Sequence, residues 1–166
     1  GKRNRLKGDD LMGFVTKLDH IAVTVSSLER SLPFYTGVLG LREVERHLLQ
    51  GETISTMAGK PGVIMQVVRL ASPDTPDILV DLQEYVQPKG SVSNAKLGMA
   101  NHSHFCFGVS NLQTAYRELK EKGVEFVSAP VAFDLGADWD YGAVQVVFLK
   151  DPDGFILELV EMPVKV

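Results

Sequence analysis

An internal duplication is the feature that most restricts how this chain can fold, because two copies of one sequence pattern predict two copies of one structural unit. The segment Leu18–Glu29 aligns with His102–Gln113 when His20 stands opposite His104, 84 positions further along. Each segment alternates apolar with polar or small residues and then passes into a helix-start pattern. The duplication therefore predicts two equivalent modules, each beginning with a strand that leads into a helix.

Each predicted helix is bounded by cap residues. Ser26–Glu29 and Ser110–Gln113 have the spacing of a capping box, in which the serine and the acid or amide satisfy free helix amides. We expect helices over 28–39 and 112–122, each ended by a glycine with left-handed backbone. Those glycines are Gly40 and Gly123. Pro33 predicts that the first helix starts late or bends.

Both modules also end on a similar strand. Ile78–Tyr85 closes the first module and Phe155–Met162 closes the second, with Asp81 aligned to Glu158. The remaining strands are expected at 42–50, 62–71, 124–128 and 143–149. The predicted fold class is α+β, with two βαβββ modules over residues 15–90 and 101–163 that form a curled mixed β-sheet cleft. Residues 1–14, rich in Lys, Arg and Gly, are expected to be a flexible arm or an expression remnant.

The composition restricts the class of protein. The chain of 166 residues carries a net charge of −4, which argues against nucleic acid as its main partner. No apolar run approaches the ~20 residues that span a bilayer, so no membrane partner is expected. The single Cys106 excludes an internal disulfide, and with no export signal visible the prediction is a cytoplasmic protein.

Four residues with metal-binding chemistry occupy equivalent strand positions in the two modules: His20, Asp81, His104 and Glu158. All four fall on the strand face opposite the apolar residues. Glu158 stands among apolar neighbours, where a carboxylate requires a cation or a strong partner. A lone histidine beside an apolar run is more often structural, but its repetition favours a shared divalent metal. If the register slips, Gln83 or Glu84 would replace Asp81 as a ligand.

Three segments of the chain resemble the vicinal oxygen chelate superfamily, which includes glyoxalase I, methylmalonyl-CoA epimerase, extradiol dioxygenases, and fosfomycin and bleomycin resistance proteins. These segments are Leu18–Val25, Phe34–Leu41 and Leu149–Leu159, and the resemblance covers about 17–163. It implies a glyoxalase-like fold of paired βαβββ modules, with the family's metal ligands at His20, Asp81, His104 and Glu158. The position of Asp81 is usually Glu or Gln in the isomerases. Without it, the remaining three form the two-histidine, one-carboxylate set associated with non-haem iron.

Other residues are candidates for substrate binding and proton transfer. Thr24 and Gln83 share the predicted cleft face, and Trp139 and Tyr141 lie in 134–142, a segment that is either a lid or a connector. His47, in the second strand, is either an acid or base near the metal or an exposed strand residue. Glu158 and His47 are therefore the candidate catalytic residues.

The leading functional expectation is a metal-dependent lyase or isomerase that acts on a small oxygenated metabolite through a metal-stabilised enediolate. The alternatives are a non-haem Fe(II) ring-cleaving dioxygenase and a metal-free protein that binds a small molecule or sequesters an antibiotic. The expected cofactor is a divalent metal ion: Zn, Ni, Co, Mn or Fe. Analogy with the family also predicts a homodimer.

Overall fold

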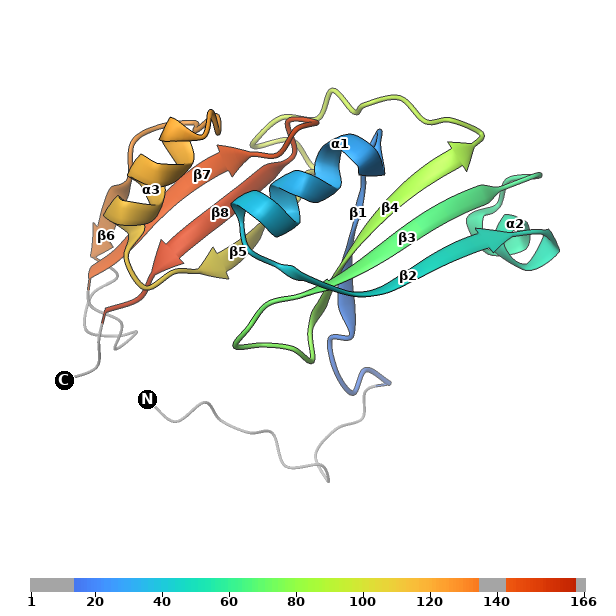
Figure 1. Ribbon diagram of the computed structural model, residues 1–166, viewed down its shortest axis with the longest axis horizontal. Helices are drawn as coiled ribbons and strands as arrows, with labels where there is room; N and C mark the ends of the chain where they lie inside the picture. The colour runs from blue at the N-terminus through green and yellow to red at the C-terminus, as the bar shows by residue number, and fades with distance from the viewer. Residues whose placement is uncertain (1–13, 135–142, 164–166) are drawn as a thin grey trace.

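The computed structural model describes residues 14–134 and 143–163. The first module contains β1 (His20–Thr24), α1 (Leu28–Pro33), the π-helical η2 (Phe34–Val38), β2 (Arg42–Gln50), α2 (Glu52–Ala58), β3 (Ile64–Ala71) and β4 (Leu79–Gln87) (Figure 1). The second contains β5 (Phe105–Gly108), α3 (Leu112–Glu121), β6 (Val131–Asp134), β7 (Ala143–Lys150) and β8 (Ile156–Glu161). Except for Phe14 and Asp134, the expected arm at 1–14 and the expected lid at 134–142 lie outside the described residues. No helix within the described ranges is long and apolar enough to cross a bilayer.

The strands form two four-stranded sheets with the same connectivity, ordered β1-β4-β3-β2 and β5-β8-β7-β6. Strand β1 runs parallel to β4, and β5 runs parallel to β8. All other neighbouring strands are antiparallel. A parallel pair needs a crossover connection, which α1 begins in the first module and α3 begins in the second. The predicted α+β class with two βαβββ modules is confirmed.

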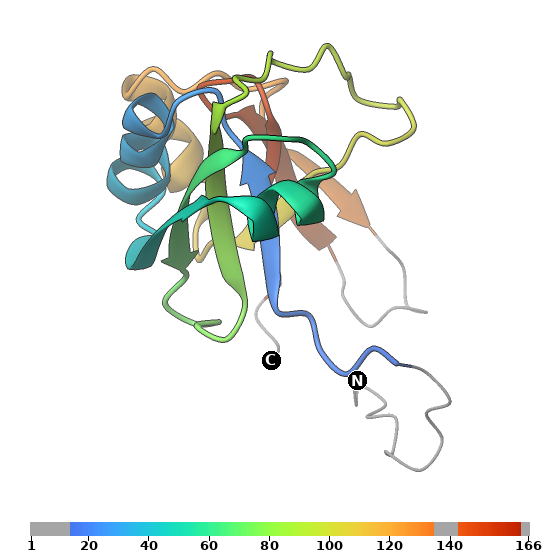
Figure 2. The ribbon, with the colours of Figure 1, turned by 90° about the vertical axis from the view of Figure 1, so that its right-hand side faces the viewer.

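Strand alternation places the apolar core on one face of each sheet. A single cluster of buried residues joins both modules and includes Val23, Tyr35, Leu70, Leu82, Leu112, Leu149 and Leu157. Burial of each such apolar side chain contributes about 1.5–3 kcal/mol. Both α1 and α3 lie on the same side of the two sheets (Figures 1 and 2). The opposite face of each sheet, here called the open face, is therefore not covered by α1 or α3.

Each of these two helices is held at its N-terminus by a carboxylate from the last strand of its own module. Glu84 Oε2 accepts from the amide of Leu28 at 2.7 Å, and Glu161 Oε2 accepts from the amide of Leu112 at 2.6 Å. These amides have no partner inside the helix, and the negative charge stabilises the positive helix end. Burial alone would raise the pKa of Glu84, but the bonds from Leu28 and Lys89 lower it below its ordinary value.

Both helices begin where expected, at Leu28 and Leu112, but their capping residues and the continuity of the first helix differ from the expectation. The capping side chains are Ser27 and Asn111, each one residue later than the predicted Ser26 and Ser110. The helix expected over 28–39 divides at Pro33, which has no amide hydrogen to continue the α-helical bonding. Beyond it the amide of Leu39 donates to the carbonyl of Phe34, five residues earlier, at 2.9 Å.

Two elements were not expected from the sequence. Helix α2 follows β2 through Gly51, whose φ of 96° is costly for other residues. It packs Ile54 against Met65 and Val67, so it covers one end of the first open face, on the opposite side of the sheet from α1 (Figure 2). Strand β6 lies at Val131–Asp134, and the strand predicted at 124–128 is present only as an isolated bridge between Phe126 and Leu149.

The two modules are joined by hydrogen bonds at the turn between β7 and β8. The buried Tyr35 hydroxyl donates to Asp151 Oδ2 at 2.9 Å, and Asp151 Oδ1 accepts from the amides of Asp153 and Phe155 at 2.8 and 2.9 Å. Burial raises the pKa of Tyr35 above its ordinary value, so the hydroxyl remains a donor. Asp153 accepts from both the amide and the hydroxyl of Ser26, at 2.6 and 2.7 Å.

Tyr35→Phe is expected to lower the free energy of unfolding by about 2 kcal/mol, because a buried hydrogen bond to a charged group is lost. Urea denaturation followed by circular dichroism measures the change. The control is Tyr116→Phe, since the hydrogen bond of its hydroxyl, among the described residues, is with exposed Lys120, at 3.3 Å. That control should change stability by less than about 0.5 kcal/mol. Equal losses in the two variants would contradict a special role for the Tyr35–Asp151 bond.

Candidate functional site

The predicted ligands lie on the open faces of the sheets. In the first sheet, Ala22 of β1 stands opposite Asp81 of β4, which stands opposite Arg69 of β3. His20 is two residues from Ala22 and therefore shares its face. In the second sheet, Cys106 of β5 stands opposite Glu158 of β8. His104 precedes β5 but lies 3.0 Å from Glu158, so all four candidate ligands lie on the open faces, as the strand alternation predicts.

The first half-site consists of His20 and Asp81. Asp81 is 7% exposed, and its Oδ2 lies 3.8 Å from His20 Nε2. The other oxygen, Oδ1, accepts a hydrogen bond from Arg69 Nε at 2.9 Å. This bond is the main reason that the pKa of Arg69 is raised above its ordinary value. A buried carboxylate needs such a partner, and here a guanidinium supplies it.

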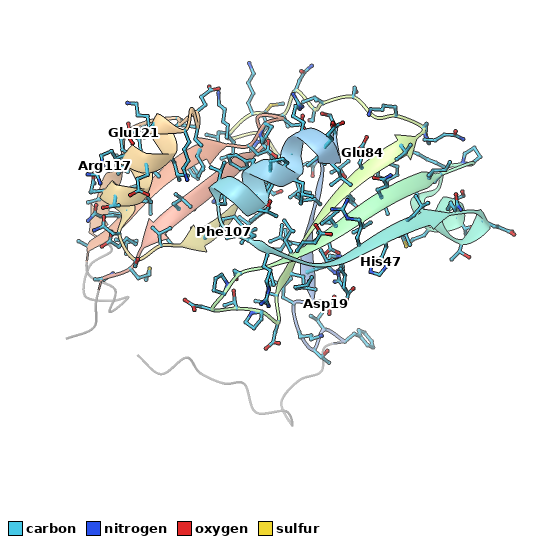
Figure 3. The ribbon with its side chains drawn as sticks, in the orientation of Figure 1. Asp19, His47, Glu84, Phe107, Arg117 and Glu121 are labelled. Atoms are coloured by element: carbon cyan, nitrogen blue, oxygen red, sulfur yellow. The ribbon has the colours of Figure 1, made fainter. Side chains whose placement is uncertain are left out.

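Two further acids lie near Arg69, one just before β1 and one on the adjacent strand β2. Its guanidinium lies 3.5 Å from Asp19 and 3.7 Å from Glu45. His47 Nε2 lies 3.0 Å from Glu45 Oε2, so the candidate acid or base contacts this charged group rather than His20. Figure 3 shows Asp19 below β1 and His47 on β2. The first open face thus carries a network of alternating charges around its half-site.

The second half-site consists of His104 and Glu158. His104 Nε2 lies 3.0 Å from Glu158 Oε2, and the imidazole stands edge-on to Phe148 with ring centroids 5.0 Å apart. Exposed Cys106 is the cross-strand neighbour of Glu158. Partial burial of its sulfur and the nearby Glu158 charge raise the pKa of the Cys106 thiol to about 12, so it is protonated at neutral pH. This half-site is therefore an imidazole and a carboxylate flanked by Phe148 and Cys106.

The two half-sites are separate within the chain. Over residues 14–134 and 143–163, no three His, Cys, Asp or Glu side chains come close enough to hold one metal ion. His20 meets Asp81 and His104 meets Glu158, but the four predicted ligands do not converge in one chain. The sequence placed all four around one point because it revealed their faces but not how the sheets are arranged.

The chemistry of the donor set nevertheless fits a divalent metal. Imidazole nitrogen and carboxylate oxygen are accepted by zinc, nickel, cobalt, manganese and iron. In the second half-site both donors lie 3.0 Å apart and point at one another. In the first, Arg69 binds only Oδ1 of Asp81 and leaves Oδ2 on the side of His20. One nitrogen and one oxygen are therefore available in each half-site.

Two predicted substrate-binding residues are brought together. Gln83 Nε2 donates to Thr24 Oγ1 at 3.1 Å, across neighbouring strands of the first open face. Beside Thr24 and Tyr85 lies a cavity of about 290 Å³, which the segment between the modules helps to enclose. Trp139 and Tyr141, the other two candidates, lie outside the described residues.

Sequence reasoning missed Arg69. The signal was present, because Arg69 interrupts the apolar run Val67-Val68-Arg69-Leu70 in the same way that Glu158 interrupts its own strand. A charged residue in a covered strand requires a partner of opposite charge, and Asp81 on the adjacent strand is that partner.

The sequence of the chain matches a known protein family. Residues 17–159 match the model of the family described as the Glyoxalase/Bleomycin resistance protein/Dioxygenase superfamily. The chain belongs to this superfamily, which agrees with its two βαβββ modules and with the resemblance found in its sequence.

Individual proteins of known name are similar to this chain in sequence. The chain is 26% identical over 159 residues to a lactoylglutathione lyase of Pseudomonas aeruginosa, covering 86% of this chain and 81% of that protein. It is 28% identical over 148 residues to Glyoxylase I 4 of Arabidopsis thaliana, covering 87% and 70%. These relatives support a glyoxalase-like function.

Solved structures agree on the fold. A glyoxalase family protein from Bacillus cereus superposes with a TM-score of 0.77 at 17% identity, covering 91% of this chain and 97% of that one. The trypanothione-dependent glyoxalase I of Leishmania major gives a TM-score of 0.59 at 18% identity, covering 89% and 87%. At these identities the likeness concerns architecture alone.

Arg69→Met is expected to lower the free energy of unfolding by about 3 kcal/mol, because it leaves buried Asp81 without its cation. The matched control is Arg46→Met, which breaks a pair with half-exposed Glu43 and should cost less than about 1 kcal/mol. Urea denaturation at neutral pH compares the two. If Arg69→Met costs no more than the control, Asp81 does not depend on Arg69.

Proposed function

We propose that this protein is a metal-dependent lyase or isomerase of the glyoxalase type that acts on a small oxygenated metabolite. The observation that carries the proposal is that each module pairs one imidazole with one carboxylate at equivalent positions of its open face. Because the pair recurs at equivalent positions of the duplicated chain, it supports a shared chemical role. The lactoylglutathione lyases among its relatives support the same class of reaction.

The complete site requires a second copy of the chain in this proposal. Each chain holds two separated half-sites on open faces that α1 and α3 do not cover, and α2 covers only one end of the first. A two-fold dimer brings the first half-site of one copy against the second half-site of the other, and does so twice. Each resulting site contains two imidazoles and two carboxylates.

A bound divalent metal would polarise the oxygen atoms of the substrate and stabilise the negative charge that develops when a proton is removed. Glu158 is the proposed proton acceptor, because it is only partly exposed and its oxygen already lies within hydrogen-bond distance of His104. His47 lies on β2, which β3 separates from the strand of Asp81; it is proposed to exchange a proton with the substrate, with Glu45 holding its ring. Thr24 and Gln83 orient the substrate, whose remote part occupies the cavity beside Thr24.

One observation favours a second candidate, a metal-free protein that binds a small molecule. Arg69 already supplies a cation to Asp81 in the first half-site. The two candidates differ in metal content after reconstitution. Bound zinc, nickel, cobalt or manganese supports the lyase or isomerase, and iron with oxygen uptake would indicate a dioxygenase instead.

His104→Ala is expected to remove bound metal while the chain remains folded, because His104 is a partly exposed side chain outside the core. Elemental analysis after reconstitution with zinc, together with circular dichroism, measures both properties. His102→Ala, two residues earlier, is the control and should retain its metal. Unchanged metal content in His104→Ala would refute the proposed metal site.

Subunit complementation tests the shared site. A heterodimer of His20→Ala with His104→Ala would contain one site with both substitutions and one intact site. When equal amounts of both variants are mixed, unfolded and refolded together, random pairing makes about half of the dimers heterodimers. We therefore expect metal binding to recover to about a quarter of the wild-type stoichiometry, although each homodimer binds little. Sites formed within single chains would show no recovery, and that result would exclude the two-copy arrangement.

A further inference from the structure

A second cavity, of about 240 Å³, lies where the two modules meet. Its walls are mainly apolar and come from both modules, including Val38, Leu39 and Leu41 from the first and Phe107, Val109 and Leu119 from the second. These residues belong to the main core or pack against it, on the helix-covered side of the sheets. The cavity is therefore distinct from both half-sites, which lie on the open faces.

The modules meet at two equivalent junctions, in each of which the helical segment of one module faces a turn of the other. The two junctions differ in their side chains, and the cavity lies at only one of them. At one junction, Tyr35 and Ser26 donate hydrogen bonds to the turn between β7 and β8. At the other, the duplication aligns Leu119 with Tyr35, and the facing turn between β3 and β4 supplies Ser72 and Pro73 to the cavity wall. Leu119 has no hydroxyl to donate, so this junction cannot repeat the Tyr35 bond and keeps an apolar hollow.

The mouth of the hollow carries one charge of each sign. Ala115, Glu118, Leu119 and Lys122 follow the spacing of one helical face and all line the cavity. Leu119 is 8% exposed, whereas Glu118 and Lys122 are exposed at the surface. A carboxylate and an ammonium group, about one helical turn apart, therefore stand beside an apolar interior.

We propose that this junction cavity is a second binding site, for a free amino acid with an aliphatic side chain. The side chain enters the apolar hollow, the α-ammonium group meets Glu118, and the α-carboxylate meets Lys122. The cavity is smaller than the roughly 300–1,000 Å³ of pockets for drug-sized ligands, which suits a ligand of this size. Because the walls come from both modules, the bound ligand stabilises their junction.

Isothermal titration of the metal-loaded protein with L-leucine tests the ligand chemistry. Three probes each lack one feature: 3-methylbutylamine has no carboxylate, 4-methylpentanoate has no ammonium group, and glycine has no side chain. We expect L-leucine to bind at least tenfold more tightly than each of them. Equal affinity of L-leucine and any one probe, or no detectable binding of L-leucine, would overturn the proposal.

Variants locate the site on α3. Glu118→Gln and Lys122→Gln should each weaken L-leucine binding at least fivefold, and Ala115→Leu, which fills the hollow, should abolish it. Arg117→Gln and Glu121→Gln are the controls, because these exposed residues, labelled on α3 in Figure 3, do not line the cavity. Thermal melts confirm that each variant is folded. If Glu118→Gln and Lys122→Gln bind L-leucine as well as the controls do, the assignment is wrong, whatever the metal content of the protein.

Discussion

The packing of the two modules against one another depends on the hydrogen bonds that the buried Asp151 carboxylate accepts. It accepts from Tyr35 of the first module and from two amides of its own turn, so the charge is satisfied from both modules. Burial raises the pKa of Asp151 against the lowering effect of those bonds. An apolar core attracts without direction, whereas these hydrogen bonds have defined geometry. Together with the bonds of Ser26 to neighbouring Asp153, they fix how the modules meet.

The way in which the modules pack determines which face of each sheet is buried. One face of each sheet packs into the common core with α1 and α3, so the polar residues of the strands lie on the open faces. Each open face carries an imidazole and a carboxylate, which the duplication supplies twice. The surroundings of the two pairs differ: Arg69 and further acids surround the first, and Phe148 and Cys106 flank the second. The two pairs thus share the same residue types but differ in their surroundings.

The sequence predicted most of the architecture because strand alternation and helix caps are local patterns. The open-face positions of His20, Asp81, His104 and Glu158 followed from parity alone. The first residue of each helix was predicted correctly, but each capping residue was misplaced by one. Adjacent polar side chains compete for the same cap, and in the first module Ser26 instead binds Asp153. Helix α2 was missed because its seven residues are stabilised by packing on Met65 and Val67 rather than by their own periodicity.

By itself the sequence determined the duplication, the apolar and open faces of the strands, and the residue types that can bind a metal. The tertiary structure decided that the four donors form two separate pairs, that Arg69 holds Asp81, and that one module junction is sealed by polar bonds while the other keeps a hollow. The reason is physical: periodicity depends on residues a few positions apart, whereas Tyr35 and Asp151 meet across 116 positions. Such contacts depend on how whole modules dock, which no local pattern specifies.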